Sequence, residues 1–189
     1  MDKLQRFNPW PIFLYNSRAT HGPDSRRLNW AERGLLYGFP TAALVTFIAF
    51  RLQLGGVPQL LAATSLLVGT MLSAFVYLSN LRIKIQETAD YRTRVRLKEL
   101  VASSAVGALH VCVIAMVLAL MLALMASWPE LTSDSVVANI ASGIAVWLLL
   151  HLLVSFSSVL RRLLGIYVEL FMSDFMAKPD SEPVPRRPA

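Results

Sequence analysis

The chain has 189 residues, of which 55% are hydrophobic and only 16% are charged, and its net charge is +6. A soluble domain of this length would carry about 25% charged residues and would keep its apolar runs short. The composition therefore excludes an ordinary soluble enzyme and predicts an integral membrane protein. The single cysteine, Cys112, excludes an intrachain disulfide.

Four apolar runs approach or exceed the ~20 residues that a helix needs to cross a hydrocarbon core. We expect spans at about 34–54, 57–81, 101–125 and 136–160. The predicted fold is an all-α integral membrane protein, with a four-helix transmembrane bundle over 30–160 and short cytoplasmic arms. No segment outside these runs is long enough to form a separate catalytic domain, so we expect no enzyme and no catalytic residue.

The N-terminal arm, residues 1–29, carries aromatic side chains among basic ones. Trp10, Phe13 and Tyr15 predict a segment that lies at the lipid headgroups. A loose arm is the alternative.

The first helix has a clear predicted start and an irregular interior. The stretch 29–32, Asn-Trp-Ala-Glu, has the form of a capping box, so the helix should begin at Trp30. Gly55 and Gly56 should end it near Leu54. Pro40 lacks a backbone N–H, so we expect a kink there.

The second helix presents small residues at every fourth position, namely Ser65, Gly69 and Ser73. Small side chains let a neighbouring helix approach closely. We expect this face to pack within the chain's own bundle, with packing against a second copy as the alternative.

The connector, residues 82–100, joins the second and third helices and holds a third of all the lysine and arginine. Its basic residues are Arg82, Lys84, Arg92, Arg94, Arg96 and Lys98. We expect both helices to project from the membrane with a turn near Thr88 to Asp90, because the alternative, an isolated hairpin, is marginally stable. The expected ligands are anionic lipid headgroups or a cytoplasmic protein partner. Without a glycine-rich phosphate loop, nucleic acid is not expected.

Charge also predicts the orientation. With four spans, 17 lysines and arginines lie on the side of the termini and the connector, and Arg51 alone lies on the other side. The positive-inside rule makes the first side cytoplasmic. We therefore expect a multi-pass protein of the cytoplasmic (inner) membrane with both termini in the cytoplasm.

The C-terminal segment, residues 161–189, begins with an apolar stretch that carries a narrow polar stripe and ends in a proline-rich tail expected to be disordered. We favour an amphipathic helix lying on the membrane surface, with a bend at Gly165. Continuation of the fourth helix is the alternative.

Two histidines lie inside the apolar runs. His110 is nine residues from Val101 at the cytoplasmic start of its run, and His151 is nine residues from Leu160 at the cytoplasmic end of its run. At 1.5 Å per residue both lie ~14 Å deep, so the two imidazoles should meet if these helices are neighbours. The options are a hydrogen bond to a neighbouring helix, a proton or ion path, or a bis-histidine haem site. No metal-ligand spacing is present, and we expect no cofactor.

Four spans, a basic connector with the sequence IKIQETADYRTRVRLKEL and no enzyme motif give a chain that resembles the small multi-span membrane effectors of bacterial defence operons. The resemblance implies an oligomeric or partner-controlled protein that alters membrane permeability. If such a protein forms a pore, the polar lining of the pore would come from Thr64, Ser65, Thr70, Ser73, Ser103, Ser104, Ser155 and Ser158. The alternatives are a non-catalytic accessory or anchor subunit that holds a partner through the connector, and a haem-binding redox subunit.

Overall fold

The computed structural model describes residues 11–15, 34–87, 95–128 and 135–172, with the backbone alone at 95, 96, 171 and 172. Its elements are η2 (Gly34–Gly38), α3 (Phe39–Ala49), α4 (Val57–Glu87), α6 (Val95–Ser127), α7 (Val136–Tyr167) and η4 (Val168–Met172). Residues 11–15 form a further helical turn. The described residues contain no strand, so the all-helical prediction is confirmed.

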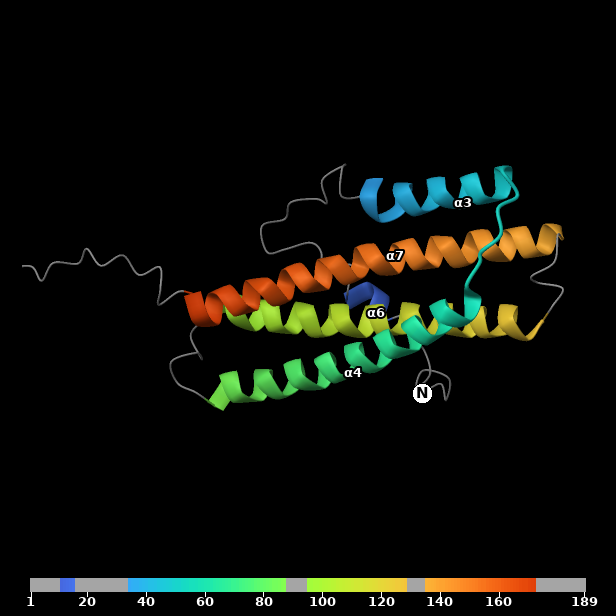
Figure 1. Cartoon of the computed structure of the whole chain (residues 1–189). Helices are drawn as coiled ribbons and strands as arrows, with labels where there is room; N and C mark the ends of the chain where they lie inside the picture. The colour runs from blue at the N-terminus through green and yellow to red at the C-terminus, as the bar shows by residue number, and fades with distance from the viewer. Residues whose placement is uncertain (1–10, 16–33, 88–94, 129–134, 173–189) are drawn as a thin grey trace, which may run out of the picture.

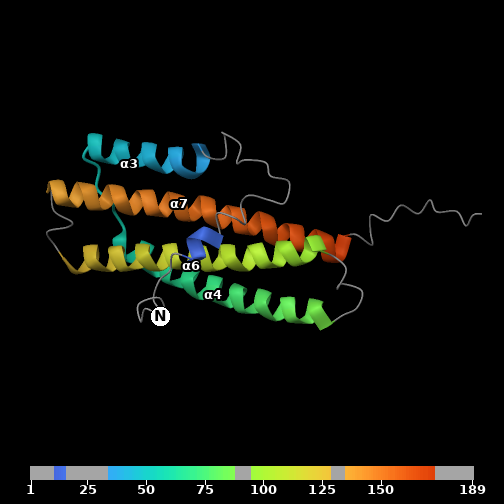
Figure 2. The same cartoon turned by 180° about the vertical axis from the view of Figure 1, so that it is seen from behind.

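The helices lie side by side in the order α4, α6, α7, α3, as Figures 1 and 2 show from opposite sides. The principal contacts are α4 with α6, α6 with α7, and α7 with α3. Three helices are long and apolar enough to cross a membrane, whereas the first apolar helix, Gly34–Ala49, is shorter. The membrane character predicted from composition therefore rests on α4, α6 and α7.

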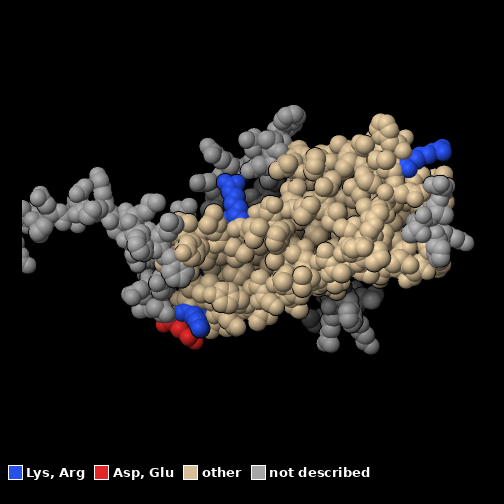
Figure 3. Space-filling view, in the orientation of Figure 1, with Lys and Arg blue, Asp and Glu red and all other residues tan. Residues whose placement is uncertain are grey.

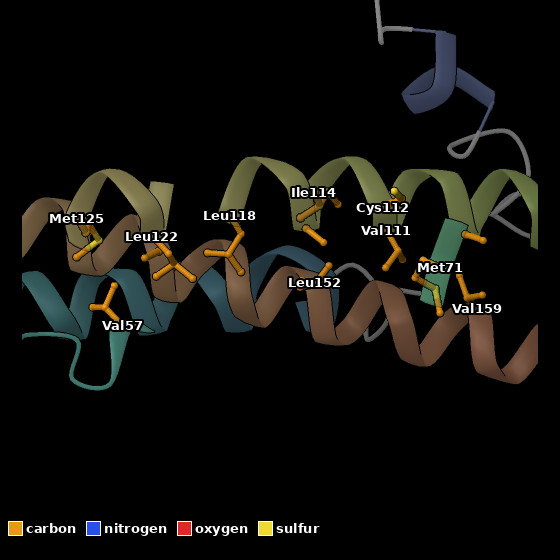
Figure 4. Packing of buried hydrophobic residues seen from close by; sticks show 13 residues of the cluster. Val57, Met71, Val111, Cys112, Ile114, Leu118, Leu122, Met125, Leu152 and Val159 are labelled. Carbon is orange, nitrogen blue, oxygen red and sulfur yellow. The ribbon is translucent and has the colours of Figure 1, made fainter. Parts of the chain in front are cut away.

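A seven-residue repeat of buried side chains holds the three long helices together. On α4 the buried residues are Val57, Thr64, Met71, Leu78 and Ile85. On α7 the same spacing runs through Ala138, Ala145, Leu152, Val159 and Ile166. The central helix, α6, buries residues at alternating steps of four and three: Leu97, Val101, Ser104, Ala108, Val111, Ala115, Leu118, Leu122 and Met125. This is the repeat of left-handed coiled-coil packing, and Figure 4 shows Leu118 and Leu122 between α6 and α7.

The first helix ends earlier than predicted. Arg51 adopts a left-handed conformation with φ of 51°. The Leu52 N–H bonds to the Phe47 carbonyl, and the Arg51 N–H bonds to the Ile48 carbonyl, which is a Schellman cap. The helix therefore stops at Ala49 rather than near Leu54. The predicted capping box at 29–32 lies outside the described residues.

The bend expected at Gly165 is not found, and the alternative, continuation of the fourth helix, is what the described residues show. The helix α7 continues through Gly165 to Tyr167. It does so because Ile166 is buried at the end of the bundle, where Leu163 and Leu170 also pack. That packing favours a straight continuation over the bend that glycine would permit.

The parts of the connector that the structure describes are helical, as expected: α4 runs to Glu87 and α6 starts at Val95. The predicted turn at 88–90, together with Arg92 and Arg94, lies outside the described residues, and the side chain of Arg96 is not described. Arg82 and Lys84 are exposed, and Lys98 is half-buried. On the face seen in Figure 3, charged side chains gather toward the two ends of the molecule, with an uncharged band between them.

The end of the bundle near the connector has a small hydrophobic core of its own. Leu78, Ile85, Leu97, Val101 and Ile166 form what we call the Ile85 cluster. It holds α4, α6 and α7 together at the ends of the expected spans, and Ile85, Leu97 and Ile166 extend it beyond them.

Candidate functional site

The structure brings the two intramembrane histidines together between α6 and α7. His110 lies at the middle of α6 and His151 at the middle of α7. Their ring centroids are 6.3 Å apart with the planes at 80°. Both side chains are more than nine-tenths buried, with 7% and 9% of their surface exposed. The expectation that the two imidazoles meet is therefore confirmed.

His151 has a backbone partner that Pro40 makes available. In a regular helix the N–H of residue 40 would bond to the carbonyl of Leu36, but proline has no N–H to give. His151 Nδ1 lies 3.3 Å from the Leu36 oxygen instead. A carbonyl can only accept, so this contact requires the proton on Nδ1 and leaves Nε2 with its lone pair in the neutral ring. The expected disturbance at Pro40 takes the form of the π-helical turn η2 just before it.

Two aromatic rings lie roughly parallel to the His151 ring. Trp147, one helical turn earlier on α7, stacks at a centroid distance of 5.4 Å with 5° between the planes. Tyr37 stacks at 5.9 Å and 27°. Trp147 Nε1 donates to Thr41 Oγ1 at 3.4 Å, and that hydroxyl donates to the Tyr37 carbonyl at 2.6 Å. These contacts attach the start of the first helix to α7 and orient His151.

His110 has a different environment. Phe13 meets its ring edge-on at 5.0 Å, and His110 Nδ1 is buried without a hydrogen-bond partner among the described residues. The contact also corrects the expectation for the N-terminal arm. Phe13 lies against the His110 ring beside the middle of α6, rather than near the end of that helix where an interfacial segment is expected.

Further buried polar side chains lie along α6 and α7 on both sides of the pair. Ser155 follows His151 by one turn, and Ser104 precedes His110 on α6. Near the other end of α7, Ser142 Oγ accepts the Leu54 N–H at 3.2 Å. Asn139 Oδ1 and Ser104 Oγ are buried and have no partner within the described part of the chain. We call this set, with both histidines, the polar row.

Arg162 lies beyond the polar row, at the end of the bundle near the connector. Its Nη1 donates to the Ser103 carbonyl at 3.0 Å. Gly107 makes room for this approach, because a Cβ there would lie 2.9 Å from Val159 Cγ2 and 3.4 Å from Arg162 Nη1. The sequence placed Arg162 outside the spans, but its side chain is half-buried against α6.

The residues expected to line a pore do not gather in one place within a single chain. Thr64, Ser104 and Ser155 are buried, whereas Ser65, Thr70 and Ser73 are exposed on α4. Ser103 and Ser158 are half-buried. The sequence also did not single out the partners of His151, although Pro40 and the Trp147–His151 spacing of four were available signals.

The packing around the pair gives no support to a haem. A macrocycle would have to separate α6 from α7, and these helices pack in direct contact through Val111, Leu152 and Val159. Two rings already stack against His151. The described residues also contain no group of three or more potential metal ligands among His, Cys, Asp and Glu.

Comparison with known proteins does not assign this chain to a family. No protein-family model, curated protein or solved structure matches the chain. The site has to be interpreted from its own chemistry.

Proposed function

We propose that this protein alters the permeability of the cytoplasmic membrane to a small ion, with the α6–α7 interface as the path. The observation that carries the proposal is the polar row. Ionisable side chains inside an apolar span are costly and are candidates for ion or proton pathways. Here they stand on both helices of the central pair, and three of their atoms have no hydrogen-bond partner among the described residues.

The proposed orientation has both termini in the cytoplasm, which places Arg162 and the connector on the cytoplasmic side. Anionic headgroups would then meet Arg82, Lys84 and Arg161, which are exposed at that end. The accessory-subunit alternative relies on the whole basic connector, Arg82, Lys84, Arg92, Arg94, Arg96 and Lys98, and it leaves the polar row without a role. We therefore favour permeability, controlled by assembly or by a partner as in the defence-type effectors.

The proposal predicts that the purified protein collapses a membrane potential. In vesicles of zwitterionic and anionic lipid, a potassium diffusion potential followed with a voltage-sensitive dye should decay at least ten times faster with protein than without it. Induction in cells should likewise depolarise the membrane. A potential that stays steady in vesicles and in cells would contradict the proposal and favour the accessory subunit.

The face of α4 with Ser65, Gly69 and Ser73 is exposed, contrary to the expectation that it packs inside the chain's own bundle. It lies opposite the buried heptad positions of α4. A Cβ at Gly69 would meet nothing within 4 Å. Ser73 also lines a shallow groove with Leu72, Val76, Tyr77 and Asn80. We propose that a second copy packs on this face, as small residues allow.

Gly69→Ile should weaken that self-association without unfolding the chain, because the added side chain projects into open space on the isolated protomer. The matched control is Ala63→Ile, an exposed position on another side of α4. Mass measured by size exclusion with light scattering should fall for Gly69→Ile alone. Equal masses for the two variants would show that this face is not the interface.

A further inference from the structure

We propose that the ion is a proton and that His110 and His151 transfer it. This inference rests on the proposed function and names its permeant species. The first support is the tightness of the interface. Gly107 leaves no room for a Cβ against Val159, and Ala108, Ala115 and Leu118 on α6 have at most 1% of their surface exposed. A hydrated metal cation would have to displace these side chains, whereas a proton moves between hydrogen-bonding groups without displacing them.

The second support is the state of the two rings. The contact with the Leu36 carbonyl holds the His151 proton on Nδ1, so Nε2 is the nitrogen that can accept another. His110 Nδ1 is buried and has no partner among the described residues. Burying a polar atom without a hydrogen bond destabilises the folded chain, so such an atom calls for an explanation. Proton transfer gives this atom a role.

The third support is the distance between the rings. Nitrogens that share a hydrogen bond approach within about 3 Å. Ring centroids 6.3 Å apart bring the nitrogens near that range once the rings turn toward each other, directly or with one water admitted between them, because His110 Nδ1 is fully buried in the resting arrangement. A proton accepted by Nε2 of His151 makes that ring an imidazolium. His151 Nε2 then gives the proton to Nδ1 of His110, which releases the proton held on Nε2 of its own ring, and the His110 ring returns to its first tautomer before the next transfer. Only N–H and O–H bonds change, and the pair gains no net charge over the cycle.

The polar row supplies neighbours for the pair on the Arg162 side, where Ser155 and Ser104 are buried. On the other side, the buried residues of α7 between Ser142 and His151 are Gly143, Ala145 and Val146. This apolar interval is the barrier to transfer, so we expect a gated flux rather than the current of an open pore. Arg162, half-buried against Ser103, keeps other cations away from the row on its side.

The test uses the full chain in vesicles loaded with pyranine, with valinomycin and potassium setting the voltage. With the wild-type protein, an inside-negative voltage should acidify the lumen and an inside-positive voltage should make it alkaline. His151→Asn keeps an amide donor for the Leu36 carbonyl but lacks the basic nitrogen, and His110→Gln removes the second relay group. Each should lower proton flux at least ten-fold. Cys112→Ala is the matched control, because Cys112 is buried on α6 two residues from His110, and its flux should be unchanged.

Thermal unfolding in detergent identifies variants that fail to fold, and ¹⁵N NMR of the histidine rings should show His151 protonated on Nδ1. Potassium or sodium flux without a pyranine response would overturn the proton inference and leave the permeability proposal standing. If neither the membrane potential nor the pyranine signal changes, the proton inference and the permeability proposal are both overturned. Proton flux that survives in folded His110→Gln and His151→Asn would remove the histidines from the path.

Discussion

Replacing Gly107 with leucine is expected to lower the Tm of the detergent-solubilised protein by about 10 °C. The hydrogen of Gly107 faces Val159, and even a Cβ would come within 2.9 Å of Val159 Cγ2. Overpacking of this kind costs about 1–3 kcal/mol. The leucine would also displace Arg162 Nη1 from the Ser103 carbonyl, and an unsatisfied buried donor adds a similar cost. For a chain of this size each kcal/mol corresponds to about 2–4 °C.

The control is Gly165→Ala on α7. A Cβ there would lie 3.8 Å from Leu100 Cδ2, which is ordinary contact. Alanine favours a helix over glycine by about 1 kcal/mol, so Tm should stay level or rise slightly. Tryptophan fluorescence during heating measures both variants. A Gly107→Leu protein as stable as wild type would show that α6 and α7 do not pack this closely.

The class of fold could be predicted from the sequence because it depends on composition. Long uncharged runs have to be spans, and their backbone must be helical to satisfy its own hydrogen bonds in lipid. The start of α4 at Val57 was also predictable, since Gly56 before it has φ of 69°, a conformation that glycine adopts readily. The seven-residue spacing on α4, from Val57 to Ile85, is also present in the sequence, but it is less conspicuous there than the stripe of small residues.

The ends of the helices depended on contacts that no local pattern reveals. Arg51 caps the first helix in a conformation usually taken by glycine, so the glycines at 55 and 56 marked the wrong residue as its end. Gly165 suggested a bend, but Ile166 is buried among side chains of α4 and α6. In both places tertiary packing overrides the local preference of the residue.

The centre of the candidate site was predictable because depth can be counted along a helix. His110 and His151 are at equal depth on neighbouring antiparallel helices, and they meet. The groups that set their chemistry were not predictable in the same way. The Leu36 carbonyl is available because of Pro40, four residues away, but its proximity to His151 follows from the packing of the first helix on α7. The contact of Phe13 with His110 comes from an N-terminal segment that the sequence does not predict to cross the membrane.

The Ile85 cluster gives the second large expected effect, because it extends the bundle beyond the apolar runs. Ile85 has 3% of its surface exposed, whereas Ile83 on the same helix has 54%. The two positions share residue type and helix and lie two residues apart in the connector, so they differ mainly in burial. A charged substitution at each one measures what the cluster contributes.

Ile85→Asp should lower Tm by about 10 °C or more, and Ile83→Asp should change it little. The first change loses about 1.5–3 kcal/mol of apolar burial and places a carboxylate among Leu78, Leu97 and Ile166, where an unpaired charge costs several kcal/mol more. The exposed site has no such cost. Hydrogen exchange at 82–87 and 97–101 should rise in Ile85→Asp, because the end of α4 would separate from α6. Equal exchange in both variants would mean that α4 and α6 do not stay packed beyond the span, and that the connector begins at residue 82 as the apolar run alone indicates.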